Sequence, residues 1–141
     1  VPLIQTTSQE GAPTSELRKW RWNVVSNYRF TAGFVKGVNV GAAVRWQDKV
    51  AIGFPVIVDP VAGSLPDVKH PFFGPVETNV DAWIGYSRKI FTRYQWSVQL
   101  NVKNIGVGDE LVPIWAQPDR SISSWRINEP QKWTLTSTVS F

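Results

Sequence analysis

The stretch WTLTSTVSF, residues 133–141, decides the fold. Apolar side chains stand at Trp133, Leu135, Val139 and Phe141, and Ser137 is the single interruption of this alternation. The positions between them carry small hydroxyl side chains: Thr134, Thr136, Thr138 and Ser140. Because successive side chains of a strand point to opposite faces, this pattern predicts a strand with one apolar and one polar face.

Four further segments, residues 20–30, 38–46, 80–90 and 96–102, repeat the alternation. In the first of them, Trp20, Trp22 and Val24 alternate with Arg21 and Asn23. Aromatic and β-branched residues dominate these segments, as is usual in strands, and no segment carries a helical stripe. We therefore expect an all-β chain that forms an antiparallel up-and-down meander of about five strands.

The predicted strands are joined by connections of two kinds. Residues 31–36 and 91–95 are short, whereas residues 47–79 and 104–132 are long and rich in proline. Short turns at one end and long loops at the other are typical of outer-membrane barrels. We expect residues 1–17 to be the end of an extracellular loop or an irregular segment. Residues 18–141 are then C-terminal β-barrel strands with two long extracellular loops, about 47–79 and 104–132.

Aromatic side chains stand at both ends of the predicted strands, with aliphatic side chains between them. Near the long loops they are Trp20, Trp22, Trp46 and Trp133. Near the short turns they are Tyr28, Phe30, Tyr86, Trp96 and Phe141. Two aromatic belts around an aliphatic band favour the wall of a transmembrane β-barrel. The alternative is a soluble sandwich with an aromatic core, because soluble sheets alternate as well.

The composition argues against several classes of function. The 141 residues include no Cys and one His, which excludes disulfides and cysteine-bound metals and leaves little for a histidine site. No nucleophile, zinc-protease, phosphate-loop or dinucleotide motif occurs, and Asp109 and Glu110 are adjacent, a poor arrangement for acid–base chemistry. The net charge of +4 is scattered, so it gives little support for nucleic-acid binding. We expect no enzyme activity, cofactor, metal or nucleic acid.

Three stretches resemble one family. Residues 125–141, WRINEPQKWTLTSTVSF, resemble the last strand of TonB-dependent outer-membrane receptors and the R-x-x-E-P-R stretch before it, with Gln131 in place of the final Arg. Residues 101–110, NVKNIGVGDE, resemble the family's N-V-x-N-L-F-D segment, with Ile105 and Gly106 replacing Leu-Phe. Residues 20–46 are similar to the hairpin that precedes them. The resemblance covers about residues 18–141.

The resemblance implies the C-terminal barrel portion of a TonB-dependent receptor in the bacterial outer membrane. Such receptors import a scarce nutrient, of the siderophore, cobalamin or glycan type, through a barrel of about 22 strands that holds a plug domain. Five strands cannot close a barrel, so we expect the chain to be a piece of a longer receptor. The implied partners are outer-membrane lipid, the remaining barrel strands and plug domain of the parent chain, the TonB energy-coupling complex reached through the plug, and the barrel-assembly machinery.

Three sets of candidate residues follow. The C-terminal signal for barrel assembly consists of Trp133, Leu135, Val139 and Phe141. The lumen-facing residues are Asn23, Asn27, Arg29, Arg45, Asp81, Trp83, Gln99, Asn101 and Lys103, among which Trp83 is an unexpected aromatic on a polar face. The loop aromatics that could contact a ligand are Phe54, Phe72, Phe73 and Trp115. The alternative function is a soluble Trp-rich β-sandwich module that binds carbohydrate.

Overall fold

A computed structural model describes residues 10–11, 13–14, 17–91 and 93–141. Within these residues the protein is all-β and contains no helix. The described residues therefore include no helix that is long and apolar enough to cross a membrane. Most of the predicted irregular segment 1–17 lies outside the described residues, and its described positions belong to no strand.

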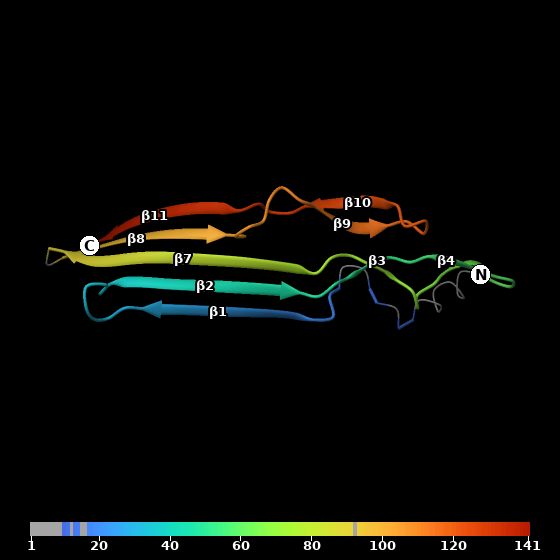
Figure 1. Cartoon of the computed structure of the whole chain (residues 1–141), viewed down its shortest axis with the longest axis horizontal. Coiled ribbons are helices and arrows are strands. Elements are labelled where there is room, and N and C mark those ends of the chain that lie inside the picture. Colours follow the sequence, from blue (N-terminus) through green and yellow to red (C-terminus); the bar gives the residue numbers. More distant parts are fainter. Residues whose placement is uncertain (1–9, 12, 15–16, 92) are drawn as a thin grey trace. The chain divides into compact units, whose positions relative to one another are not determined.

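The main element is one five-stranded antiparallel sheet, in which neighbouring strands run in alternating directions (Figure 1). Its strand order is β1-β2-β7-β8-β11. Each of these five strands is therefore paired with the one that comes before it and the one that comes after it among the five in the sequence. The bounds are β1 Arg21–Arg29, β2 Val38–Gln47, β7 Glu77–Ile90, β8 Tyr94–Lys103 and β11 Lys132–Ser140. The five-stranded up-and-down meander predicted from the alternation is therefore confirmed.

The observed strands differ from the predicted segments mainly at their ends. β7 begins at Glu77 rather than at residue 80, and β8 begins at Tyr94 rather than at residue 96. Between β1 and β2 the chain turns through Gly33 and Gly37, whose φ angles of 71° and 92° suit glycine. The amide of Gly37 donates to the carbonyl of Phe30 over 3.0 Å and so closes this hairpin.

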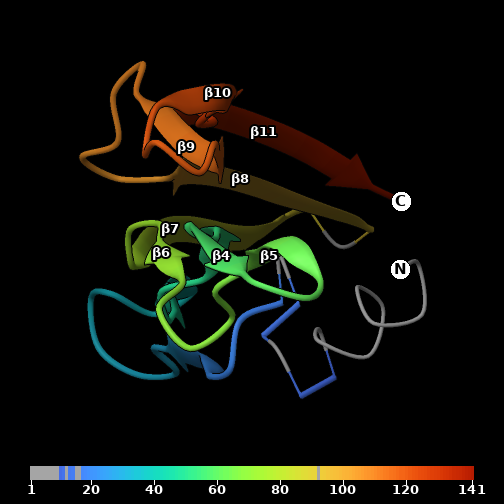
Figure 2. The ribbon, with the colours of Figure 1, turned by 90° about the vertical axis from the view of Figure 1, so that its right-hand side faces the viewer.

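The two long connections contain six short strands that the sequence pattern did not reveal. They form three two-stranded antiparallel sheets, β3–β6, β4–β5 and β9–β10, several of which are labelled in Figure 2. The bounds are β3 Ala51–Gly53, β4 Val56–Asp59, β5 Gly63–Pro66, β6 Phe72–Phe73, β9 Leu111–Ala116 and β10 Ile122–Ile127. These strands are two to six residues long, and β5 and β9 contain proline, so they are too short to show a period of two.

The chain divides into two compact units. The loop unit comprises Val1–Arg21, Gln47–Glu77 and Glu110–Asn128, and the sheet unit comprises Trp22–Trp46, Thr78–Asp109 and Glu129–Phe141.

A small apolar core holds the described part of the loop unit together. Val50, Ile52 and Ala116 are buried, and Phe72 and Ile122 pack against them. Gly53 lies so close to the Ala116 carbonyl that a Cβ at this position would overlap with it. The close approach of β3 to β9 therefore requires glycine at residue 53.

Glu77 pairs with two arginines of the loop unit. Its carboxylate accepts hydrogen bonds from Arg18 and, over 2.6 Å, from Arg126. The Arg18 side chain is only 8% exposed, and it also donates to the carbonyl of Pro75 over 3.3 Å. Breaking either ion pair would leave a largely buried charge without its partner, which is unfavourable. The two pairs therefore hold together the segments around residues 18, 77 and 126.

Candidate functional site: the polar face of the five-stranded sheet

The strand register brings polar side chains from three strands into continuous rows. Trp83 of β7 lies opposite Asn101 of β8, which lies opposite Thr134 of β11. The next rows along the strands are Gly85–Gln99–Thr136 and Ser87–Ser97–Thr138. Because directly opposite residues of a sheet point to the same face, these rows define one polar surface.

The Trp83 side chain extends across β2 on this polar face. Its indole Nε1 donates a hydrogen bond of 3.1 Å to Oδ1 of Asn27 on β1, and β2 runs between the two strands. A Cβ at Gly41 of β2 would overlap with the indole ring, so glycine at this position makes room for it. The unexpected aromatic on the polar face, Trp83, is thus accommodated by Gly41 and hydrogen-bonded to Asn27.

A similar fit occurs one row further along the sheet. The side-chain amide of Asn39 occupies the space that a Cβ at Gly85 would need, and Gly85 is the one buried residue in the five strands of the sheet. Arg29 Nη2 donates to Ser87 Oγ over 3.0 Å. Together with Trp83–Asn27, these contacts link β1, β2 and β7 through their side chains.

A polar cluster around Asn104 lies at the other end of the sheet unit. Arg45 Nη2 pairs with Asp81 Oδ2 at 3.0 Å, and Asp81 Oδ1 accepts the backbone amide of Asn104 at 2.9 Å. The Asn104 side chain accepts a hydrogen bond from Asn79 Nδ2 and donates one to the carbonyl of Glu129, both over 3.1 Å. Asn104 is only 3% exposed and has a φ of 52°, in the left-handed region that asparagine tolerates.

A shallow hollow of about 200 Å³ opens on the polar face. Gln99 Nε2 donates to Asn101 Oδ1 over 2.7 Å beside it. The polar side chains that line the hollow are Asn39, Ser87, Ser97, Gln99, Asn101, Thr136 and Thr138. This lining offers amides and hydroxyls that can both donate and accept hydrogen bonds. It suits the binding of a polar surface and contains no pairing of a nucleophile with a base.

The structure places the nine residues predicted to face a lumen in different surroundings. Asn27, Arg29 and Trp83 take part in the side-chain contacts across β1, β2 and β7, and Gln99 and Asn101 line the hollow. Arg45 and Asp81 belong to the Asn104 cluster. Asn23 is exposed on β1. Lys103 is exposed at the end of β8, directly opposite Lys132.

The residues predicted to form the C-terminal assembly signal follow the other face. Trp133 pairs with Val102, Leu135 with Leu100 and Val139 with Trp96. Phe141 comes directly after β11 and is 99% exposed. The interruption at Ser137 has a partner, because Trp96 Nε1 donates to Ser137 Oγ over 3.1 Å. A hydroxyl on this face thus satisfies the indole of an aromatic neighbour.

The predicted loop aromatics also divide into two groups. Phe72 packs against the core of the loop unit, with the Arg120 guanidinium 5.3 Å from the centre of its ring, and Phe54 is half-buried. Phe73 and Trp115 are each about half exposed, and Lys49 Nζ lies 4.4 Å from the centre of the Phe73 ring. Phe73 and Trp115 are therefore the members of this set with most surface available to a ligand.

Sequence reasoning missed two residues that organise these surroundings. Asn104 was only part of a recognised stretch, although an Asn followed by Ile-Gly at a strand end is a signal for a left-handed turn. Glu77 had no assigned partner, because Arg18 and Arg126 are 59 and 49 residues away in the sequence.

Comparison with models of known protein families, with curated proteins and with solved structures found no match to this chain.

Proposed function

We propose that this chain forms the C-terminal strands of an outer-membrane β-barrel receptor of the TonB-dependent type. The observation that carries the proposal is the two-sided character of the open sheet. One face presents exposed apolar rows, and the other presents amides, hydroxyls and charges joined by side-chain hydrogen bonds. The resemblance of the last strand and of residues 101–110 to that family supports the same assignment.

The apolar face is suited to contact with lipid. The register sets Ala82, Val102 and Trp133 in one row and Ile84, Leu100 and Leu135 in the next. These side chains are not covered by the described residues, since Leu135 is 70% and Ile84 51% exposed. In water such a surface is unfavourable by about 25 cal/mol per Å² of apolar area, whereas hydrocarbon solvates it well.

The aromatic side chains of this face support the same placement. Trp22 and Trp46 stack at 6.0 Å, near the ends of β1 and β2 that adjoin residue 20 and the first long connection. Tyr28 and Phe30 meet edge to face at 4.9 Å, near the short β1–β2 turn. Amphipathic rings at both limits of an aliphatic band match the two water–membrane interfaces.

The edges of the sheet supply the second argument. Within the described residues β1 pairs only with β2, and β11 pairs only with β8, so each has one unpaired edge. Hydrocarbon does not tolerate unpaired backbone amides and carbonyls, which cost several kcal/mol each. The proposed wall therefore requires further strands on both sides, which the remaining barrel of the parent chain would supply.

The polar face then lines the barrel lumen, and its hollow beside Gln99 and Asn101 would meet a plug domain by hydrogen bonds. The transport role, import of a scarce nutrient driven through the plug by TonB, follows from the family resemblance. The half-exposed Phe73 and Trp115 are the loop aromatics best suited to contact such a ligand. The proposed activity is transport, in which no residue of this chain takes part in covalent chemistry.

Cell fractionation tests the proposal. An antibody raised against residues 58–74 should detect a heat-modifiable band in the outer-membrane fraction. That band should be several times larger than the 15.9 kDa of this chain. A soluble band near 15.9 kDa would overturn the proposal. Carbohydrate binding by that soluble form, lost on Trp133→Ala, would establish the sugar-binding alternative instead.

A further inference from the structure

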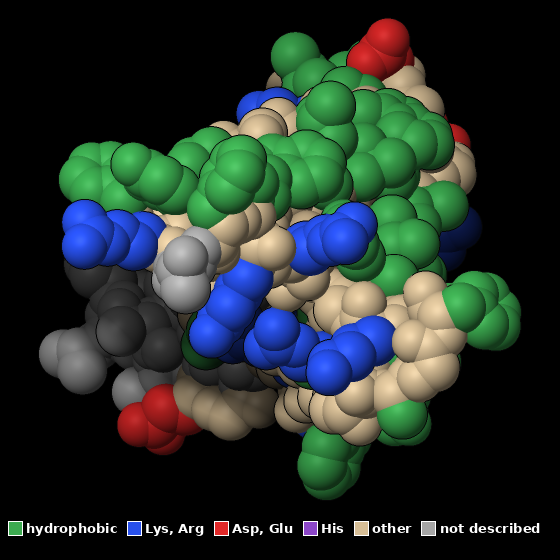
Figure 3. Space-filling model, turned by 90° about the vertical axis from the view of Figure 1, so that its left-hand side faces the viewer, with side chains coloured by type: hydrophobic (Ala, Val, Ile, Leu, Met, Phe, Trp, Pro, Cys, Tyr) green, Lys and Arg blue, Asp and Glu red, His purple; other side chains and the backbone are tan. Residues whose placement is uncertain are grey.

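Five basic side chains gather at the short-turn end of the five-stranded sheet. They are Arg29, Lys36, Arg88, Lys89 and Arg93, all exposed. Residues 28–38 and 86–97, which supply them, contain no Asp or Glu. In Figure 3 this end faces the viewer, and Lys and Arg side chains gather beside an apolar surface. A third of the 15 basic residues of the chain thus lies in two segments that contain no acidic residue.

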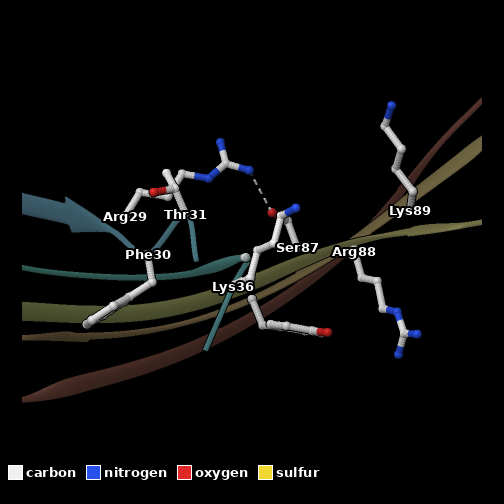
Figure 4. Close-up of a pocket in the computed structure, with 9 residues that line it drawn as sticks. Arg29, Phe30, Thr31, Lys36, Ser87, Arg88 and Lys89 are labelled. Atoms are coloured by element: carbon white, nitrogen blue, oxygen red, sulfur yellow. Dashed lines mark hydrogen bonds between the residues drawn. The ribbon is translucent and has the colours of Figure 1, made fainter. Parts of the chain in front are cut away.

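Four of these side chains line one hollow of about 650 Å³ (Figure 4). They are Arg29, Lys36, Arg88 and Lys89. Arg29 donates to Ser87 Oγ over 3.0 Å, which orients its guanidinium while using one of its five N–H donors. Among the described residues, no carboxylate forms an ion pair with any of the four. The hollow therefore offers positive charge and hydrogen-bond donors that suit an anion.

Aromatic rings border the same hollow. Phe30 and Tyr86 belong to its lining, and Figure 4 shows Phe30 and Arg29 directed to opposite sides. Tyr86 meets Trp96 edge to face at 6.4 Å, and Trp96 lies opposite Val139 on the apolar face. Arg88 lies opposite Trp96 and so belongs to the apolar face, whereas Lys89 lies opposite Gln95 and is directed to the other side (Figure 4). At the strand ends the basic groups therefore flank both faces of the sheet, and Arg88 is the one that stands beside the apolar face.

We propose that this basic hollow binds the phosphate of anionic phospholipid headgroups. The inference rests on the proposed barrel, in which the apolar face contacts lipid. A phospholipid then brings its phosphate to the level of the aromatic rings, where Lys and Arg side chains bind it by charge-assisted hydrogen bonds. Free phosphate shares this chemistry, but it lacks the acyl chains that would cover the apolar face of the same strands.

Vesicle flotation of the full 141-residue chain tests the inference. The chain is diluted from urea into phosphatidylglycerol or phosphatidylcholine vesicles at equal salt. Each basic residue near an anionic membrane surface raises the binding affinity about fivefold. We therefore expect the preference of the K36Q/R88Q/K89Q variant for phosphatidylglycerol to be at least about tenfold weaker than that of the parent chain. Its binding to phosphatidylcholine should be unchanged.

A matched control separates this site from net charge. The K19Q/K69Q/K132Q variant removes the same three charges outside residues 28–38 and 86–97 and should keep the preference. If the control loses as much as the first variant, the inference is overturned. If K36Q/R88Q/K89Q fails to bind neutral vesicles, the single variants K36Q and R88Q decide. Each should lose about fivefold of the preference for phosphatidylglycerol. A preference in both single variants equal to that of the parent chain would overturn the inference.

Two further outcomes separate the sources of phosphate and the two proposals. Inorganic phosphate that displaces the chain from phosphatidylglycerol better than chloride of equal ionic strength would identify a free-phosphate site and overturn the lipid assignment. Binding to both vesicles without preference would overturn this inference and leave the barrel proposal intact. Binding to neither vesicle would contradict the barrel proposal and, with it, the headgroup site.

Discussion

Trp83 and Asn27 are joined across an intervening strand by a 3.1 Å hydrogen bond from the indole Nε1 to the amide oxygen. The indole reaches that far because Gly41, on the strand between them, has no side chain. The polar face is therefore a fitted surface in which one aromatic, one amide and one glycine depend on one another.

The first prediction concerns Gly41→Ala. A methyl group there overlaps with the Trp83 indole, and overpacking of this kind costs about 1–3 kcal/mol. The free energy of unfolding, measured with urea in the detergent or lipid that supports folding, should fall by that amount. In a Trp83→Ala background the same change should cost little, and an equal cost in both backgrounds would contradict the fit.

The second prediction concerns Asn104→Ala. Asn104 is buried, so its removal leaves Asn79 and the Glu129 carbonyl without their partner and places alanine at a φ of 52°. The loss of these two hydrogen bonds costs about 1–3 kcal/mol in total, at about 0.5–1.5 kcal/mol each, and the left-handed backbone adds about 1 kcal/mol. Urea unfolding should show a loss of about 2–4 kcal/mol from these two terms.

Asn104→Gly separates the two contributions. Glycine accepts the left-handed backbone and removes only the side-chain hydrogen bonds, so it should recover about 1 kcal/mol relative to alanine. If the two variants are equally unstable, the backbone conformation contributes nothing and this part of the explanation is wrong.

The five long strands could be predicted from the sequence because each is amphipathic over many residues. In β11 the alternation from Trp133 to Val139 repeats often enough to outweigh the single exception at Ser137. That exception has a physical cause, the hydrogen bond from Trp96, which depends on the pairing of β8 with β11. A pattern within one segment cannot reveal a contact that two segments make together.

The contacts of the candidate site were less predictable for the same reason. Trp83 was recognisable as unusual, but its match to Gly41 depends on how β2 and β7 are aligned across a long connection. Likewise, Glu77 meets Arg126 only because β7 and β10 belong to segments brought together by folding. Short strands such as β6, Phe72–Phe73, hold too few residues for any periodicity to appear.

The third prediction concerns the loss, at low pH, of the turn hydrogen bonds that Asp59 and Asp119 accept. Asp59 accepts the amides of Val61 and Ala62, and Asp119 accepts the amide and hydroxyl of Ser121. These hydrogen bonds, led by those from Ala62 and from the Ser121 side chain, hold the pKa of each carboxyl below its ordinary value of 3.8. The stabilisation is therefore complete above the unfolded pKa and is lost as the pH falls through the lower native pKa.

Hydrogen exchange checks this at single amides. Protection of Ala62 and Ser121 should stay constant from neutral pH to about pH 4 and fall below it, because only then do the carboxylates take up protons. The amide of Gln117 serves as the control, since it donates to the Ser121 carbonyl, which does not titrate. A parallel loss at Gln117 would indicate general unfolding instead.

The fourth prediction compares adjacent residues on opposite faces of β11. Leu135 belongs to the apolar row with Ile84 and Leu100, and Thr136 belongs to the polar row with Gly85 and Gln99. In the proposed barrel, Leu135→Arg puts a cation into hydrocarbon at a cost of about 2–4 kcal/mol near the midplane, whereas Thr136→Arg remains hydrated. Outer-membrane assembly, followed by the heat-modifiable band, should fail for the first variant and persist for the second. Equal assembly of both would mean that the two faces meet the same solvent, which a barrel wall cannot do.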